Sequence, residues 1–192
     1  LVGSEMCIRD RYTILDGTIV RSPTGVLIGG TPEVRKDNIG DGYVWGIEAD
    51  GIYRASPSWY VLGTATYMDG EVDQLDATGT LTRRPLSRMK PLSTLLGLRF
   101  EPPSGRFWAQ AEWQHVSKED RLSFRDESDS RRIPPGGTPG YDIFHFRVGY
   151  KVNRKVNASL SVENLTDENF RVHGSGQNEP GTNFIFALDI DI

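Results

Sequence analysis

Three histidines are the side chains in this 192-residue chain that could most directly bind a metal ion. The imidazole nitrogens of His115, His145 and His173 are of the kind that bind Zn²⁺ and other transition metals. The first two histidines fall in different alternating segments, and the third falls in a polar connection, with no spacing typical of a site. We therefore expect ordinary polar positions, with no metal ligand and no cofactor.

A second group of candidates combines acidic and basic side chains that alternate with apolar ones: Glu48, Arg99, Glu112, Arg147 and Glu163. Such pairs could serve general acid and base chemistry, or they could line a solvated wall. No nucleophile, base and orienting group converge at a readable spacing, so we expect no catalytic residue and no enzyme. We predict that these five residues face inward, into a polar lumen.

Stretches of strict apolar and polar alternation are the elements that would position these side chains. Leu160 and Val162 share one face near the C-terminus, and Phe184 and Phe186 do so after a polar connection. Strands are predicted at residues 42–54, 59–67, 92–100, 107–113, 144–150, 156–162 and 184–192, and a less regular one at 12–21.

The predicted connections alternate between short and long. Short turns fall at residues 55–57, 102–105 and 153–155, and long polar loops at 22–41, 69–90, 118–140 and 165–182. A soluble sandwich has no reason to sort its loops in this way, whereas an outer-membrane barrel has short periplasmic turns and long extracellular loops.

The apolar stripes themselves favour lipid over a protein core. No Asp, Glu, Lys or Arg lies on the stripe of the seven clear strands, where a basic residue at the membrane midplane would cost roughly 2–4 kcal/mol. Aromatic residues such as Trp59 and Tyr67 flank smaller ones such as Gly63 and Ala65, as in the two aromatic girdles of a barrel. We predict an all-β, antiparallel, up-and-down transmembrane β-barrel.

Composition argues against a nucleic-acid partner, a transmembrane helix and an internal disulfide. The net charge is -4 with a pI of about 5.4, and the basic residues form no continuous patch, so nucleic acid is not expected as a partner. No run of about 18 apolar residues predicts a transmembrane helix. Cys7 is the only cysteine, which excludes an internal disulfide.

The N-terminal residues need a separate interpretation. Residues 4–11 read SEMCIRDR, which resembles a translated sequencing-adapter artefact. We expect residues 1–11 to be non-native and residues 12–192 to belong to the barrel, which would extend upstream. The alternative is a native, irregular N-terminus.

Several short motifs carry a resemblance to a known family. They are Gly46-Ile47-Glu48, Arg84-Pro85, Gly140-Tyr141, the run from Val162 to Phe170 (VENLTDENF), and the run from Glu179 to Phe184 (EPGTNF). In this order, from about Asn38 onward, the chain resembles the C-terminal part of the β-barrel of TonB-dependent outer-membrane receptors. The chain departs from the family pattern at Thr182, commonly Arg, at Phe170, often Tyr, and at Ile192, usually aromatic.

The resemblance implies a fragment of roughly eight strands from a plugged barrel of about 22 strands. It implies an active transporter in the outer membrane of a Gram-negative bacterium, for a scarce ligand such as a ferric siderophore or cobalamin. The implied partners are outer-membrane lipid and lipopolysaccharide, a plug domain absent from this sequence, the TonB complex through a missing N-terminal region, and the small-molecule ligand. The long loops should hold the ligand contacts.

Two other functions remain open at this stage. A complete small barrel could have a structural or adhesive role, but Gly97, Gly149 and Ser159 on its inward face would leave its interior under-packed. A soluble β-sandwich binding protein would instead pack its apolar stripes together in a core. The charged residues of 118–132 could bind a ligand or lipopolysaccharide phosphates, although a solvated loop surface is the simpler interpretation.

Overall fold

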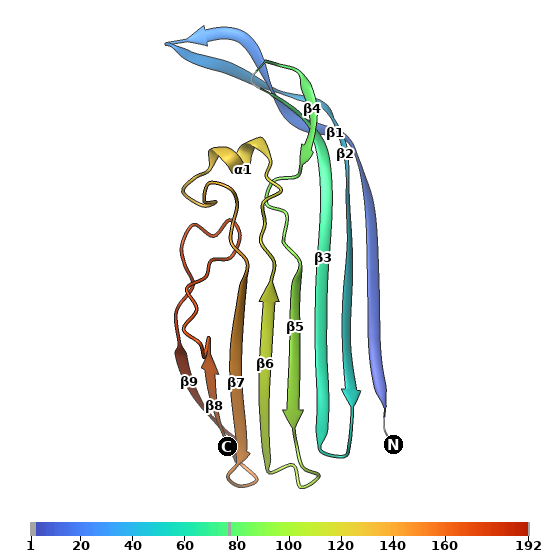
Figure 1. Cartoon of the computed structure of the whole chain (residues 1–192), viewed down its shortest axis with the longest axis vertical. Coiled ribbons are helices and arrows are strands. Elements are labelled where there is room, and N and C mark those ends of the chain that lie inside the picture. Colours follow the sequence, from blue (N-terminus) through green and yellow to red (C-terminus); the bar gives the residue numbers. More distant parts are fainter. Residues whose placement is uncertain (1–2, 77, 192) are drawn as a thin grey trace.

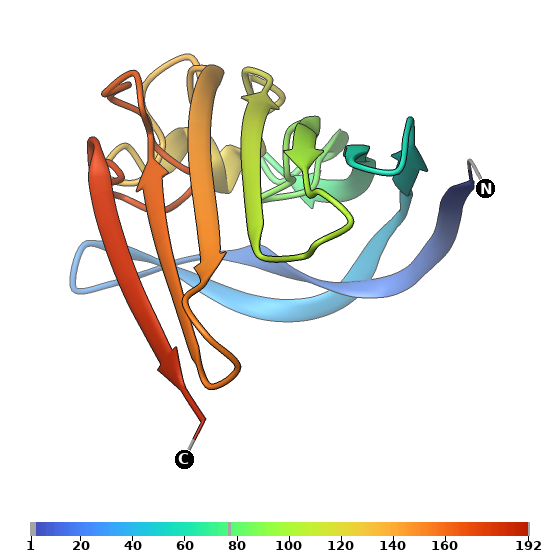
Figure 2. The ribbon, with the colours of Figure 1, turned by 90° about the horizontal axis from the view of Figure 1, so that it is seen from below.

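The computed structural model describes residues 3–76 and 78–191, which form one antiparallel sheet (Figure 1). Seen from below, the sheet is a curved, open trough with the two chain ends at opposite edges (Figure 2). Its order is β1-β2-β3-β5-β6-β7-β8-β9, with β4 paired to β3 alone. The elements are β1 (Ser4–Ile28), β2 (Thr31–Arg54), β3 (Trp59–Leu75), β4 (Leu81–Pro85), β5 (Ser93–Phe100), β6 (Phe107–Val116), α1 (Phe124–Ser128), β7 (Tyr141–Lys151), β8 (Val156–Glu163) and β9 (Asn183–Ile190).

The predicted all-β antiparallel architecture is confirmed, and the sheet is not closed. Eight strands follow one another along the sheet and β4 is an addition, which agrees with the expectation of roughly eight. Within the described residues, no pairing joins β1 to β9. Among those residues no helix is long and apolar enough to cross a membrane.

The predicted apolar stripes lie in register on one face of the sheet. Val61 pairs with Leu98, Leu98 with Ala111, Ala111 with Phe146, Phe146 with Val162, and Val162 with Phe184. This face is not a core, because Leu96 is 45% exposed, Phe146 41% and Phe186 70%. A sandwich would bury these side chains, so the single sheet with an exposed apolar face contradicts that alternative.

Aromatic side chains meet across neighbouring strands at both ends of this apolar face. Near one end the ring centroids of Trp45 and Tyr67 are 5.4 Å apart, and near the other those of Trp59 and Phe100 are 4.9 Å apart. Trp59 and Tyr67 are eight residues apart on β3, or roughly 26 Å at 3.3 Å per residue. That spacing is close to the ≈ 25 Å apolar band of membrane barrels, measured along a tilted strand.

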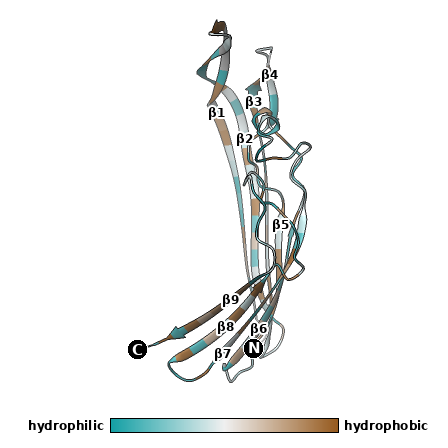
Figure 3. Cartoon of the chain, turned by 90° about the vertical axis from the view of Figure 1, so that its left-hand side faces the viewer, coloured by the Kyte–Doolittle hydropathy of each residue, from teal (hydrophilic) through white to brown (hydrophobic). Residues whose placement is uncertain are grey.

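The short turns after β2, β5 and β7 lie at one end of the sheet, and the long connections lie at the other (Figure 1). We call these the short-turn end and the long-loop end. Hydrophobic segments concentrate on the strands, whereas the connections around α1 are largely hydrophilic (Figure 3). The predicted sorting of short turns and long connections to opposite ends is therefore confirmed for the connections after β3, β6 and β8.

The prediction of a loop at residues 22–41 was wrong. β1 and β2 continue through this segment as a long hairpin beyond the other strands, which we call the hairpin arm (residues 16–41; Figure 1). Its turn is Gly29-Gly30, with φ values of +57° and +81°, as two-residue hairpin turns favour. Register shifts between Leu15 and Thr18 and between Pro23 and Leu27 accommodate residues that suggested a loop.

The predicted loop at residues 69–90 is also partly strand, because β3 runs on to Leu75 and β4 pairs back onto it. This extension places Asp69 on the same face as Tyr67, and the start of β7 places Asp142 on the face of Phe144. The expectation that strand charges avoid the apolar face thus holds along the apolar band but fails at the long-loop end of the strands.

The residues proposed to be non-native form regular backbone pairs where the structure describes them. Ser4 to Arg11 pair with Tyr53 to Gly46 of β2. Asp10 stands opposite Ile47 and therefore lies on the apolar face. The non-native origin of residues 1–11 stays a prediction, and Ile192 lies outside the described residues.

Candidate functional site

Three of the five predicted lumen residues meet in one polar network on the face opposite the apolar stripes. Arg99 Nη1 donates to Gln110 Oε1 at 3.1 Å, and Gln110 Nε2 donates to Glu112 Oε1 at 2.7 Å. Arg147 Nη1 lies 3.5 Å from Glu112 Oε2. Glu112 is only 8% exposed, so these neighbours replace much of the water that a carboxylate needs.

An aromatic residue adjoins this network nearer the short-turn end. The guanidinium of Arg99 lies over the ring of Trp108, 4.4 Å from its centroid. The indole of Trp108 covers Gly149, where any β-carbon would collide with it. We did not single out Trp108 or Gln110 from the sequence, although alternation from Glu112 places both on the same face.

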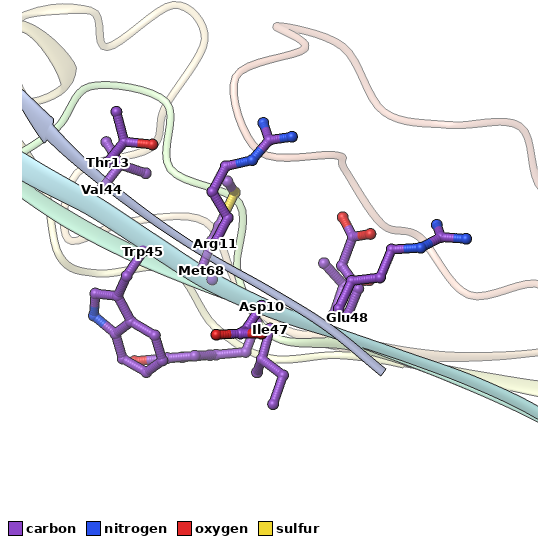
Figure 4. Close-up of a pocket in the computed structure, with 12 residues that line it drawn as sticks. Asp10, Arg11, Thr13, Val44, Trp45, Ile47, Glu48 and Met68 are labelled. Carbon is purple, nitrogen blue, oxygen red and sulfur yellow. The ribbon is translucent and has the colours of Figure 1, made fainter. Parts of the chain in front are cut away.

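Glu48 and Glu163 share this face but belong to no common site with the network. Glu48 stands opposite Arg9 on one side of the sheet, and Glu163 stands opposite Asn183 on the other. Residues on both faces line an open hollow of about 670 Å³ along β1 to β3. Trp45 and Ile47 extend to one side of the strands, and Glu48 to the other (Figure 4). This hollow is exposed sheet surface and encloses no site.

The structure also keeps the three histidines apart. His115 Nδ1 lies 2.9 Å from Asp142 Oδ1, which accepts a hydrogen bond from Trp113 Nε1 as well. His145 Nδ1 accepts from the backbone of Asn164 at 3.4 Å, and His173 is buried in a loop. In the part of the chain that the structure describes, no group of three or more His, Cys, Asp or Glu side chains could hold a metal ion.

The long connections pack against one another instead of standing free in solvent. We call them the loop cap: residues 86–92, 117–140 and 164–182. Arg88 joins all three, because its Nη1 donates to the carbonyl of Gly174 at 3.1 Å and its Nη2 donates to Asp129. Its Nε is 3.6 Å from Asp126 Oδ1. The interpretation of these charges as a solvated loop surface is therefore incomplete.

The short helix α1 is fixed in the loop cap by a capping box. Ser123 Oγ accepts from the backbone of Asp126, whose side chain accepts in turn from the backbone and hydroxyl of Ser123. Ser87 also donates to Asp126, at 2.8 Å. Burial alone would raise the pKa of Asp126, but these hydrogen bonds outweigh it and leave the pKa below its ordinary value.

A small core lies within the loop cap. Ile133 is 2% exposed, and the ring centroids of Tyr141 and Phe170 are 4.4 Å apart. The hydroxyl of Thr138 and Nδ1 of His173 are 2.9 Å apart, and both residues are buried. Burial lowers the pKa of His173 and so keeps its imidazole neutral. Sequence periodicity could not reveal this core, because all its members except Tyr141, the first residue of β7, lie in irregular segments.

Comparison with known proteins identifies the family to which this sheet belongs. Residues 12–165 match the family described as TonB dependent receptor-like, beta-barrel. The chain belongs to this family. A search of curated proteins found no match.

Solved structures similar to this TonB-dependent receptor-like barrel have the same fold. They include "Copper transporter OprC" (20% identity, TM-score 0.71) and the FrpB iron transporter from Neisseria meningitidis (12% identity, TM-score 0.73). A third is the ferric-catecholate import receptor Fiu from K12 E. coli (15% identity, TM-score 0.66). Each match covers 97% of this chain, which spans only 25–29% of those chains.

Proposed function

We propose that this chain is part of an outer-membrane TonB-dependent receptor that imports a scarce ligand, such as a ferric siderophore or cobalamin. The family to which the chain belongs consists of such receptors and transporters. The observation that carries the membrane location is the continuous, exposed and uncharged band on one face of β2 to β9, bounded by aromatic residues.

The opposite face supports the proposed plug. A wall with Arg99, Glu112 and Arg147 in one hydrogen-bonded network suits a polar protein surface more than a side-chain-filled small barrel. A complete small barrel is less well supported, because β1 and β9 stay unpaired to each other among the described residues. We propose a transport role and not an enzymatic one. The TonB complex and lipopolysaccharide are proposed as further partners of the full-length protein.

The test uses the full-length gene that contains this segment. We expect its product to fractionate with the outer membrane, to migrate differently on gels before and after heating, and to support TonB-dependent growth on a ferric siderophore or cobalamin. A product found as a water-soluble monomer would overturn the proposal. An intact outer-membrane barrel with no TonB-dependent uptake would instead favour the structural or adhesive role.

A further inference from the structure

Charged residues are distributed unequally between the two ends of the sheet. Five basic residues and one acidic residue lie in the three short connections, at 54–58, 101–106 and 151–155. The long segments at 69–90, 118–140 and 165–182 hold ten basic and twelve acidic residues. The net charge of the chain is -4, so the short-turn end is a basic region of an acidic protein.

Four of these basic residues lie close together where β6 begins and β7 ends (Figure 1). The backbone N–H of Lys151 donates to the carbonyl of Arg106 at 2.8 Å, and Arg154 and Lys155 follow in the next turn. We call these four residues the basic rim. All four are exposed, and within the described residues none of their side chains makes an ion pair or a hydrogen bond.

Nearby carboxylates leave the basic rim without a counter-charge. Glu101 already pairs with Arg99, whose Nη2 lies 2.9 Å from Glu101 Oε2. Asp189 and Asp191, near the end of β9, make no ion pair with the rim among the described residues, and Asp191 contacts Lys155 through backbone atoms only. Like charges on neighbouring strands repel, so an anionic partner would stabilise this arrangement.

The basic rim adjoins the apolar face of the sheet. Phe107 pairs with Tyr150 on that face, and both aromatic side chains are exposed, directly next to Arg106 and Lys151 in the sequence. By alternation Arg106 and Lys151 belong to the polar face, but they lie at the strand ends. Long basic side chains at such positions extend their charged groups into the headgroup layer while their stems stay on apolar surface.

We propose that the basic rim binds the headgroups of anionic phospholipids in the membrane leaflet at the short-turn end. The lipid phosphates pair with the exposed ammonium and guanidinium groups, and the acyl chains pack against Phe107 and Tyr150. Clusters of basic residues beside a membrane interface attract anionic lipids in this way. This inference rests on the proposed function, because it requires the membrane location, and it adds the class of lipid that contacts one end of the barrel.

The test measures which lipids lie next to the short turns. The full-length receptor, with every other cysteine replaced by serine, carries a fluorophore at Ser104→Cys in the turn before β6 and is reconstituted into phosphatidylcholine vesicles. A small fraction of the lipid is phosphatidylglycerol or phosphatidylcholine that bears a nitroxide near the top of one acyl chain. Quenching of the fluorophore then gives the relative association constant of the two lipids at this site.

We expect phosphatidylglycerol to be preferred over phosphatidylcholine by about tenfold or more, because several basic residues contribute. Lys151→Gln and Arg154→Gln should each lower this preference by about fivefold, as the loss of one charge at the interface implies. The control Arg131→Gln removes an exposed charge at the long-loop end and should leave the preference unchanged.

Several outcomes would overturn the inference. Equal quenching by the two lipids would leave the basic rim to a soluble acidic partner, and equal effects of Lys151→Gln and Arg131→Gln would remove the role of its position. Loss of the preference on addition of millimolar glycerol 3-phosphate would assign the rim to a soluble phosphate. If Lys151→Gln fails to assemble, Lys155→Gln provides the same comparison. TonB-dependent uptake that persists without a lipid preference would refute this inference alone, whereas a water-soluble product would refute the proposed function.

Discussion

The hairpin arm and the loop cap lie at the same end of the sheet but are stabilised in different ways. The arm is held almost entirely by backbone pairing between β1 and β2, and beyond Val20 its apolar side chains are exposed, with Leu27 at 67% and Ile28 at 63%. The cap has little regular structure, yet it buries Ile133 and Asp126 and joins three segments through Arg88. A regular backbone therefore does not indicate which region is better supported by side chains.

This difference predicts unequal responses to ligand and to mutation. Regions with few buried apolar contacts open locally at low free energy, whereas packed regions open together. We expect the cap to behave as one cooperative unit and the arm to move independently of it. Hydrogen–deuterium exchange on the full-length receptor, resolved by segment, is the measurement common to the predictions that follow, except the last.

The largest effect should come from Arg88→Ala. Removing this side chain leaves Asp126 buried at 1% exposure without its cationic partner, and it also removes the bond to Gly174. We expect the free energy of opening of the cap to fall by about 3 kcal/mol. Exchange should rise in residues 117–140 and 164–182 together and stay unchanged in the arm.

The backbone of Arg88 provides a control for that variant. Its φ of +63° lies in the left-handed region, which glycine adopts without strain. Arg88→Gly should therefore destabilise the cap by about 1 kcal/mol less than Arg88→Ala. Faster exchange confined to residues 86–92 would contradict the idea of a single cooperative cap.

A slightly smaller effect is expected from Ile133→Ala. Ile133 is 2% exposed, so its truncation should leave a cavity and cost about 3 kcal/mol or somewhat less in cap stability. The matched variant Leu27→Ala truncates a side chain that is 67% exposed in the arm, and should change local stability by less than about 0.5 kcal/mol. Similar effects of the two variants would remove the distinction between the regions.

The same two regions show where sequence reasoning succeeded and where it could not. The apolar band was predictable because one face of these strands is apolar and the other is polar, so alternation specifies both the strands and their register, as for Val61, Leu98 and Ala111. Most of the apolar side chains of the arm are exposed, so burial places no such constraint on its pattern. Its Pro, Gly and charged residues therefore predicted a loop, although backbone pairing is enough to form strands there.

The loop cap was unpredictable for another reason. Arg88 contacts Asp126 and Gly174, which are 38 and 86 residues away along the chain, and no local pattern marks such pairs. Alternation did identify the faces of Arg99, Glu112 and Arg147, but not that Gln110 would connect them. Period-two patterning gives the side of a strand on which a residue lies, and side-chain packing decides its partners.

A third effect should be confined to the arm. Gly30 has a φ of +81° in the hairpin turn, where a β-branched residue is strained, so Gly30→Val should destabilise the arm by about 1–2 kcal/mol. Exchange should increase in residues 19–36 and remain unchanged in the cap. Gly63→Val is a suitable control, because a β-carbon there meets only Leu96 at 3.5 Å, an ordinary contact, and its φ is not positive. Propagation of the change into residues 117–140 would show that arm and cap are coupled.

The smallest effect concerns the pH dependence of the cap. His173 has a lowered pKa in the closed cap, so below its ordinary pKa of about 6.5 the open cap binds a proton that the closed cap does not. Cap stability should therefore be constant above about pH 6.5 and fall as the pH decreases toward the lowered pKa. Asp126 affects cap stability in a separate, more acidic range. Its stabilising contribution is fully present above about pH 3.9 and is lost as the pH falls through its lowered pKa.

His173→Asn isolates the histidine contribution, because an amide can occupy the position of Nδ1 beside Thr138 but does not titrate. A nitroxide label at Gln177→Cys, in a protein with every other cysteine replaced by serine, would report cap mobility by electron paramagnetic resonance between about pH 8 and pH 5. Mobility should rise on acidification in the parent and in the control His145→Asn, and stay flat in His173→Asn. The arm carries no histidine, so a label at Val26→Cys should be insensitive over this range, and an equal response there would trace the pH effect to a cause other than the buried imidazole.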